Sequence, residues 1–410
     1  MTTFVNTIPK RWALQATFRS GLTRPLPWRQ HQLYQLARMA QNERGLVCDA
    51  LWKDLGKPKT EALSNELGNV IDRAVKSAER LPERAKPEHP EVVDRQKPWN
   101  PTIYKAPKGT VLIISPWNFP MMLSFQPLIG AIAAGCTAEI VPKYLDPNMY
   151  RIVNSGIPET SKLLELQWDH IFYTDNGKVA RIVASAAAKH LTPLTLELGG
   201  KSPVIIDSAY DICVAPDYVL VQRDKQDELV KALQSIITHS SQMGEVVPPG
   251  RADAARKRLE LTIFKNVADG DSLLEEELFG PILPIVPVDF LDQAINFVNA
   301  RSHPLVLYAF SDNKRLKQRL ISETRSGGIV FNDTLQQFAV SELPFAGVGE
   351  SGYGSQFSKY TYDTFTQLRS SMDMPREAEA NLAMRYLPHS KEAVKTITAA
   401  VYTPIPPSSL

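Results

Sequence analysis

The stretch that decides the fold is VLIISPWNFPMMLSFQPLIGAIAAGCTA, residues 111–138, which contains no charged side chain. By length alone it could form a helix that spans a bilayer. Three prolines interrupt it, at positions 116, 120 and 127, and prolines this close together would break a helix exposed to lipid. We therefore predict a buried strand at Val111–Ser115, a turn at Pro116–Pro120 and then a buried helix.

Outside this stretch, short apolar runs alternate with helical patterns. Continuous apolar runs are typical of strands in a sheet that is buried on both faces, and they occur at His170–Tyr173, Leu194–Leu196, Val204–Asp207 and Val219–Gln222. Val179–Lys189 and Lys225–Ile237 have the apolar spacing of helices. The alternation predicts an α/β fold with parallel sheets. We predict a loop over the polar residues 239–256 and disorder over Tyr402–Leu410.

The composition excludes several classes of protein. Of the 410 residues, 43% are hydrophobic and 22% are charged, as in ordinary soluble proteins. The net charge is only +2, so the sequence gives no electrostatic case for a nucleic-acid partner. Cys48, Cys136 and Cys213 stand far apart without a CxxC pair, so we predict neither a metal site nor a disulfide scaffold, and we expect a reducing compartment.

The N-terminal third is predicted to be helical. Its first 42 residues carry six basic residues and no acidic one, which resembles a transit peptide. We favour the alternative, an amphipathic surface helix. Leu63, Leu67, Val70, Ile71 and Ala74 make a clear helical stripe further along. The proline-rich segment 82–101 indicates an irregular connection or an extended arm.

One glycine motif is ambiguous. Gly347-Val-Gly349-Glu-Ser-Gly352 satisfies GxGxxG, but a dinucleotide-binding fingerprint requires a strand before it and a helix after it within a βαβ unit. Leu343-Pro-Phe345-Ala precedes the motif, and Tyr, Gly, Ser and Gln follow it. We therefore predict a plain glycine loop.

Several fragments could carry chemistry. Asn118 follows a predicted buried strand, at the kind of position where ligand crevices form in open α/β sheets. Glu197 is a lone carboxylate at an apolar strand end, which is costly unless the group is paired or used. Glu277 and Phe279 place an acid and an aromatic ring before a turn. Cys213 lies beside apolar residues, where a thiol is usually packed and inert, so that residue alone does not indicate a nucleophile.

Together these fragments resemble the aldehyde dehydrogenase superfamily, most closely its class 3 or fatty aldehyde dehydrogenase-like branch. The likeness runs from about Arg19 to Pro375. Its strongest pieces stand in the family's order: Ile114-Ser-Pro-Trp-Asn-Phe-Pro, Thr195-Leu-Glu-Leu-Gly-Gly-Lys-Ser-Pro, Ile212-Cys-Val-Ala-Pro-Asp-Tyr, Glu277-Leu-Phe-Gly-Pro and Leu343-Pro-Phe-Ala-Gly-Val-Gly-Glu-Ser-Gly. One such piece is moderately specific, whereas five in order make chance resemblance remote.

The resemblance implies oxidation of medium- or long-chain aliphatic, or aromatic, aldehydes to carboxylic acids with NAD or NADP. The Cys213 thiolate would attack the aldehyde. The Asn118 side chain and the Cys213 backbone N–H would stabilise the oxyanion, and Glu197 would be the general base that activates water. The cofactor-binding residues implied by the resemblance are Trp117, Glu277, Phe279 and Gly199.

The chain also departs from the family. Glu197 and Cys213 are only 16 residues apart, whereas a helix and a loop separate the corresponding residues in the family. After Ala138 the family's Lys-Pro-Ser strand and the following helix are missing, so Lys143 should not be equated with the family's cofactor lysine. Asp175 stands where the family has glycine near the cofactor pyrophosphate, and an acid would repel phosphate. Residues 242–273 are shorter than their counterpart. These gaps indicate that whole coding pieces have been omitted.

Three functions stay open at this point: an active class 3-like dehydrogenase, a non-catalytic member that acts as an interaction protein, and a cofactor-independent hydrolase that uses Cys213 and Glu197. The resemblance also implies a homodimer, and we expect a cytoplasmic location, since residues 376–410 contain no apolar run long enough for a membrane anchor.

The predicted architecture is a doubly wound cofactor domain, a second α/β catalytic domain and a small oligomerisation arm. The predicted parts are a truncated cofactor-binding domain at 1–199 with an arm at 98–110, a catalytic domain at 200–353, a return and oligomerisation segment at 354–375 and a tail at 376–410.

Overall fold

The computed structural model describes residues 7–138, 149–151, 156–206, 216–242, 262–280, 282–334 and 336–401. The chain forms two compact units. One unit contains residues 1–85 and 107–367, and the other contains residues 86–106 and 368–410. The predicted disordered tail, Tyr402–Leu410, lies outside the described residues.

A five-stranded sheet forms the first half of the larger unit. Its strand order is β12-β5-β4-β2-β3, and its members are β2 (Thr110–Ile114), β3 (Thr137–Ala138), β4 (His170–Asp175), β5 (Leu194–Leu198) and β12 (Gly352–Tyr353). Neighbouring strands are parallel except for β12, which pairs antiparallel with β5. The carboxyl ends of β2, β4 and β5 therefore share one edge of the sheet.

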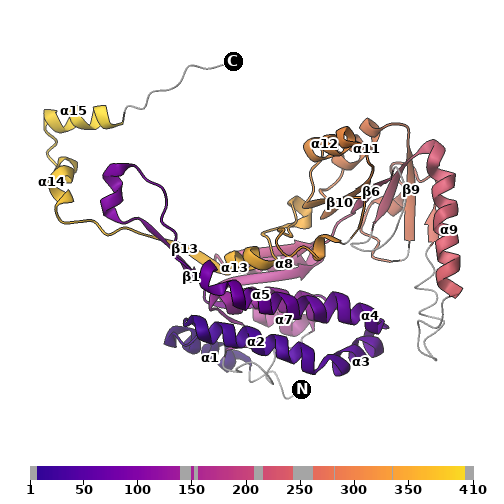
Figure 1. Ribbon diagram of the computed structural model, residues 1–410, viewed down its shortest axis with the longest axis horizontal. Helices are drawn as coiled ribbons and strands as arrows, with labels where there is room; N and C mark the ends of the chain where they lie inside the picture. The colour runs from indigo at the N-terminus through magenta and orange to yellow at the C-terminus, as the bar shows by residue number, and fades with distance from the viewer. Residues whose placement is uncertain are drawn as a thin grey trace. The chain divides into compact units, whose positions relative to one another are not determined.

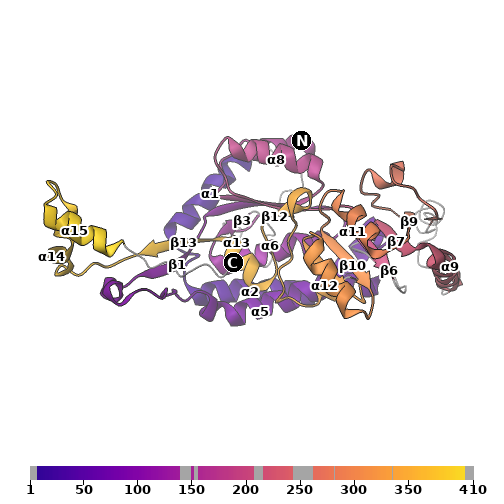
Figure 2. The same ribbon diagram turned by 90° about the horizontal axis from the view of Figure 1, so that it is seen from above.

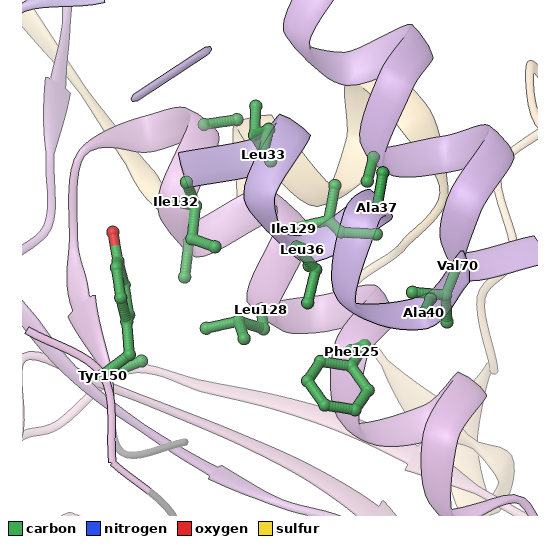
Figure 3. Packing of buried hydrophobic residues seen from close by; sticks show 14 of the residues in the cluster. Leu33, Leu36, Ala37, Ala40, Val70, Phe125, Leu128, Ile129, Ile132 and Tyr150 are labelled. Atoms are coloured by element: carbon green, nitrogen blue, oxygen red, sulfur yellow. The ribbon is translucent and has the colours of Figure 1, made fainter. Parts of the chain in front are cut away.

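Helices cover both faces of this sheet, because successive strand residues point to opposite sides. Phe172 of β4 packs with α2 (Leu26–Asn42), α5 (Asn69–Arg84) and α6 (Pro120–Ala134), whereas its neighbours Ile171 and Tyr173 pack with α7 (Ile157–Leu164) and α8 (Gly177–Ala188). Figure 2 shows α8 on one side of the strands and α2 and α5 on the other. Figure 3 shows the packing of the cluster to which Phe172 belongs, in which Leu36 lies among side chains of α6.

The uncharged stretch at residues 111–138 folds as expected. Its first residues belong to β2, the turn follows, and α6 begins at Pro120 and ends at Ala134. Proline is compatible with the first helical position, where its missing N–H would have no helical partner. In the described part of the chain, no helix is long and apolar enough to cross a membrane.

A six-stranded sheet forms the second half of the larger unit, in the order β11-β10-β6-β7-β9-β8. All its neighbouring strands are parallel. The strands are β6 (Pro203–Ile206), β7 (Tyr218–Gln222), β8 (Thr262–Phe264), β9 (Ile282–Val288), β10 (Val306–Phe310) and β11 (Gly328–Phe331).

The helices on the six-stranded sheet are α9 (Gln226–Gln242), α11 (Leu291–Asn299) and α12 (Lys314–Glu323). Figure 1 shows α9 beside β9, and α11 and α12 together beside β10. The predicted loop at 239–256 is wrong at its start, because α9 continues to Gln242. Residues 239–242 are all polar, so the hydrophobic pattern ends before the helix does. The rest of that segment lies outside the described residues.

The N-terminal part is helical, as expected. It contains α1 (Thr7–Ser20), α2, α3 (Arg44–Leu55), the short α4 (Lys59–Glu61), a π-helical segment η1 (Ala62–Gly68) and α5. Leu33 and Leu36 of α2 are fully buried, so this helix is part of the core. Two further elements of the larger unit are α13 (Ser358–Thr364) and the 3-10 turn η6 (Gly349–Ser351).

The smaller unit contains the segments predicted to form the arm. β1 (Thr102–Pro107) and β13 (Thr366–Ser371) form a two-stranded sheet. A 3-10 turn, η2 (Asp94–Trp99), precedes β1, and α14 (Ala378–Leu382) and α15 (Lys391–Ala400) follow β13. The remaining short 3-10 turns, all in the larger unit except η7, are η3 (Arg223–Lys225), η4 (Ser272–Leu274), η5 (Gln336–Phe338) and η7 (Ala383–Arg385). The oligomerisation role and the predicted domain boundaries stay predictions.

The packing of α2 allows a matched test of the core. Leu36→Ala removes a fully buried side chain, and we expect it to lower the free energy of unfolding by about 2–5 kcal/mol, since it leaves a cavity. Leu46→Ala on α3 removes a side chain that is 69% exposed and should change it by about 0.5 kcal/mol or less. Urea denaturation followed by tryptophan fluorescence measures both. Equal losses would contradict the packing described here.

Candidate active site

The Asn118 side chain lies just beyond the carboxyl end of β2, in the turn that precedes α6. Its side-chain oxygen Oδ1 is buried and has no hydrogen-bond partner within the part of the chain that the structure describes. A buried amide oxygen without a partner is costly, and such a group is uncommon in a folded protein. The side chain is therefore a candidate for contact with a ligand.

Glu197 lies one residue before the end of β5 and is only 3% exposed. Among the described residues, its Oε1 atom has no hydrogen-bond partner. Burial raises the pKa of this carboxyl well above its usual range, and a hydrogen bond with the Gln356 side chain opposes that shift. Burial thus favours the protonated form, and a carboxyl group in such a position is a candidate for taking up and releasing a proton.

The ambiguous glycine motif lies beside the strand that carries this carboxyl group. Gly352 begins β12 and pairs with Glu197 on β5. Its φ is 114°, and a Cβ atom there would lie 2.0 Å from the carbonyl oxygen of Leu196. Only glycine allows that approach. The motif is a glycine loop, as predicted, and its last glycine allows β12 to pair with β5 beside Glu197.

The strand register brings Asn118 and Glu197 to the same edge of the sheet. Ile114 of β2 is level with Tyr173 of β4, and the next residue, Thr174, is level with Glu197 of β5. The two strands that carry the candidates are separated by β4 alone. In open α/β sheets, ligands bind beyond the carboxyl ends of the strands.

Glu277 packs directly against the glycines that follow β5. A Cβ atom on Gly199 would lie 2.2 Å from Oε2 of Glu277, and the Gly200 backbone N–H donates a hydrogen bond to the carboxylate. Burial raises the Glu277 pKa, and the negative charge of Asp217 adds to that shift. A side chain at position 199 would therefore displace the Glu277 carboxylate from this position.

Two polar side chains, those of Lys201 and Asp217, hold the segment that carries Glu277. Lys201 Nζ donates to the backbone carbonyls of Leu273 and Glu276 at 2.9 and 2.8 Å. Asp217 Oδ1 accepts the Leu278 backbone N–H at 3.0 Å. The acid and the ring after it are thus fixed relative to the end of β5.

The two aromatic candidates, Trp117 and Phe279, come together at the surface. Their rings are 66% and 62% exposed, and the ring centroids lie 6.2 Å apart in an edge-on arrangement. Phe279 has a φ of 44°, which is unusual for a bulky residue. A left-handed backbone at this position turns the ring toward Trp117 and can indicate a functional constraint.

Asp175 is exposed at the carboxyl end of β4. Its Oδ1 accepts the Asn176 backbone N–H at 2.8 Å, and the Asn176 side chain accepts from Val179 N at 3.0 Å as the N-cap of α8. The N-terminus of α8 therefore already has a carboxylate beside it. This placement agrees with the predicted departure from a phosphate-binding sequence.

Cys213 lies outside the described residues, as does Lys143. Of the cysteines that are described, Cys48 and Cys136 are both buried and free. Burial raises the pKa of Cys136 to about 11, so it is protonated at neutral pH. Among the residues with described positions, no cluster of His, Cys, Asp and Glu could hold a metal ion.

Sequence reasoning missed two features of this site. Gln356 contacts the Glu197 carboxyl, and Lys57 donates to the Asn118 backbone carbonyl at 2.8 Å. Neither residue belongs to a motif with a recognisable spacing. Lys57 directly follows Gly56, the left-handed C-cap of α3. A glycine followed by a lysine at this place indicates the end of a helix and not a functional site.

The comparisons with known proteins agree with the geometry. A family model described as the aldehyde dehydrogenase family matches residues 13–155, 138–245 and 221–371. The mouse protein named aldehyde dehydrogenase family 3 member A2 is 38% identical over 443 residues, which cover 93% of this chain and 91% of that protein. The bovine protein named aldehyde dehydrogenase family 3 member B1 is 36% identical and covers 98% of both chains.

Solved structures show the same fold. The structure titled substrate bound state of Staphylococcus aureus AldH has a TM-score of 0.89 and 33% identity, and it covers 97% of this chain and 99% of that one. The NAD+ complex of an aldehyde dehydrogenase from Bacillus cereus has a TM-score of 0.76 at 21% identity, covering 88% and 87% of the two chains.

The comparisons also support the predicted internal deletions. Because 93% of 410 residues is about 381, roughly 60 of the 443 positions aligned with the mouse protein are gaps in this chain. The first and second matched ranges overlap at 138–155, and the second and third overlap at 221–245. The first overlap begins where the sequence predicted a missing strand and helix.

Glu197 should make stability depend on pH. Because its folded pKa is raised, the unfolded chain ionises first as pH rises above about 4.3, so the folded state loses stability until the folded pKa is passed. Glu197→Gln, which resembles the protonated acid, should therefore raise the melting temperature, and by more at pH 8 than at pH 4. Glu275→Gln, which replaces an exposed acid by the same amide, is the matched control for the substitution itself. If the difference in melting temperature between wild type and Glu197→Gln is the same from pH 4 to pH 8, the raised pKa of the buried Glu197 carboxyl is contradicted.

Proposed function

The chain belongs to the aldehyde dehydrogenase family, and we propose that it oxidises an aldehyde to a carboxylic acid with NAD or NADP, using Cys213, Asn118 and Glu197. The observation that carries the proposal is the pair of unsatisfied oxygens at one sheet edge. Among the described residues, Asn118 Oδ1 and Glu197 Oε1 are both buried without a partner, at the ends of strands that β4 alone separates. A water that donates a hydrogen bond to each oxygen would relieve both costs.

The residues divide the chemistry between them. The Cys213 thiolate adds to the aldehyde carbonyl and forms a thiohemiacetal. The side-chain N–H of Asn118, together with the Cys213 backbone N–H, stabilises the developing oxyanion. Oxidation of this adduct gives a thioester on Cys213. Glu197 then removes a proton from the water that attacks the thioester, which releases the acid and restores the thiol.

A nicotinamide cofactor accepts the hydride when it is bound. Glu277 would accept hydrogen bonds from a ribose, since it is a carboxylate held in place by the Gly200 N–H. Trp117 and Phe279 offer exposed aromatic surface for a nicotinamide ring, and Gly199 admits close approach. The dog relative named aldehyde dehydrogenase, dimeric NADP-preferring, is 36% identical over 91% of this chain and 96% of its own, which supports a nicotinamide cofactor and a homodimer for this chain without choosing between NAD and NADP.

The class 3 relatives support a medium- or long-chain aliphatic, or an aromatic, aldehyde as the substrate. The motifs do not line an entry path, so they do not select one aldehyde. A cytoplasmic location is proposed on the sequence evidence alone.

A second candidate, the non-catalytic interaction protein, is favoured by a specific observation. Asp175 places an exposed carboxylate next to the N-terminus of α8, and roughly 60 positions of the alignment with the mouse relative are gaps in this chain. A third, the cofactor-independent hydrolase, needs only Cys213 and Glu197.

We expect wild-type protein to form NADH or NADPH from a medium-chain aliphatic aldehyde, and Cys213→Ala to lower kcat by about 10³-fold or more, because the nucleophile is lost. Absorbance at the reduced-cofactor band measures this. Cys48→Ala, at a buried free thiol, is the control and should retain turnover.

Other outcomes identify the alternatives. Failure of NAD and NADP to bind in a calorimetric titration would favour the interaction protein. Ester cleavage that requires Cys213 and does not respond to either cofactor would favour the hydrolase.

A further inference from the structure

A buried ion pair lies beneath the turn that carries Asn118. Lys57 Nζ is 2.6 Å from Glu66 Oε1, and the two side chains are 7% and 0% exposed. A second acid, Glu61, is 4.0 Å from the same ammonium group and is partly exposed. Removing two charges from water is expensive, and their attraction offsets that cost only where further hydrogen bonds satisfy both groups.

The ammonium group of Lys57 holds the backbone of the turn. Its Nζ donates to the carbonyl oxygen of Asn118 at 2.8 Å. It also lies 3.6 Å from the ring centroid of Phe119, within the range of a cation–π contact. Lys57 thus contacts Asn118 and the residue that follows it.

The carboxylate of Glu66 holds the next two residues. Its Oε2 accepts the backbone N–H groups of Met121 and Met122 at 3.0 and 2.9 Å. These are among the first N–H groups of α6, which has no cap from the side chain at its own N-cap position. An acid at a helix N-terminus is favourable for both its hydrogen bonds and its charge.

The pair therefore holds the chain on both sides of the Asn118 side chain. Glu66 comes from the π-helical segment η1, and such segments occur often at functional sites. An apolar pair of similar volume would serve stability as well or better. What an apolar pair cannot do is fix a carbonyl and two N–H groups within five residues of one another.

We propose that Lys57 and Glu66 are positioning residues that act through Asn118, by fixing the backbone from which its side chain reaches the reacting oxygen. The inference rests on the proposed function, since it assigns the pair a part in the same reaction. Neither residue touches the substrate in this role.

The test uses a variant that should fold. Lys57→Met alone leaves Glu66 as a buried charge without a partner, so the double variant Lys57→Met/Glu66→Leu removes both charges together. Lys59→Met, at an exposed lysine two residues further on, is the matched control. Two readouts are needed: the steady-state kinetics of aldehyde oxidation, and hydrogen exchange of the amides in residues 119–124.

We expect the double variant to lower kcat about tenfold, which is less than the roughly 10²-fold loss expected for Asn118→Ala as an oxyanion donor, with the KM for aldehyde changed less than about twofold. In the Asn118→Ala background the double variant should add less than about a twofold loss, because residues that act through one group are not additive. The double variant should also accelerate exchange in residues 119–124, whereas Asn118→Ala and Lys59→Met should not.

The outcomes separate this inference from the proposed function. A full tenfold loss in the Asn118→Ala background would show that the pair acts independently of Asn118 and would overturn the proposal. Unchanged exchange in the double variant, with normal wild-type turnover, would do the same. Absence of turnover in the wild type would refute the proposed function itself, and the role in the reaction with it.

Discussion

The structure depends on the burial of one carboxyl group at the end of an interior strand. Glu197 lies on β5 between β4 and β12, and Gly352 of β12 comes so close to β5 that a Cβ atom there would meet the Leu196 carbonyl oxygen. Among the described residues no cation is paired with the Glu197 carboxyl, so burial raises its pKa. This cost is the physical reason to place chemistry here, because a purely structural site would have been better filled by an apolar side chain. The Glu277 carboxylate lies near the end of the same strand, where it accepts a hydrogen bond from the Gly200 backbone N–H.

Much of this fold could be predicted because its signals are local. Apolar runs fixed β2, β4, β5 and β7 to within two residues, and Pro120 marked the start of α6 because proline suits the first turn of a helix. Asn118 and Glu197 emerged from the same reasoning, since a polar residue at the end of an apolar run is conspicuous. The end of α9 was missed because its last four residues, 239–242, are polar and carry no hydrophobic pattern.

The rest of the site depends on contacts between segments far apart in the chain. Lys57 and Asn118 are 61 positions apart, and nothing near either predicts their hydrogen bond. Gln356 reaches Glu197 only because β12 pairs antiparallel with β5. A lysine after a helix-capping glycine, or a glutamine after a glycine loop, has many ordinary explanations. Such partners become visible only when the register of the strands and the start of α6 are known.

Two departures from the family bear on cofactor binding, the Asp175 carboxylate and the alignment gaps, and their expected effects on affinity differ in size. Asp175 is exposed, and two unit charges 4 Å apart repel by about 1 kcal/mol in a water-like dielectric. Each phosphate charge near it would weaken binding by about fivefold at most, and salt would screen part of that. The roughly 60 alignment gaps are a larger matter, because whole elements supply many contacts at once. The balance between an active dehydrogenase and an inactive relative therefore rests more on these gaps than on the single charge of Asp175.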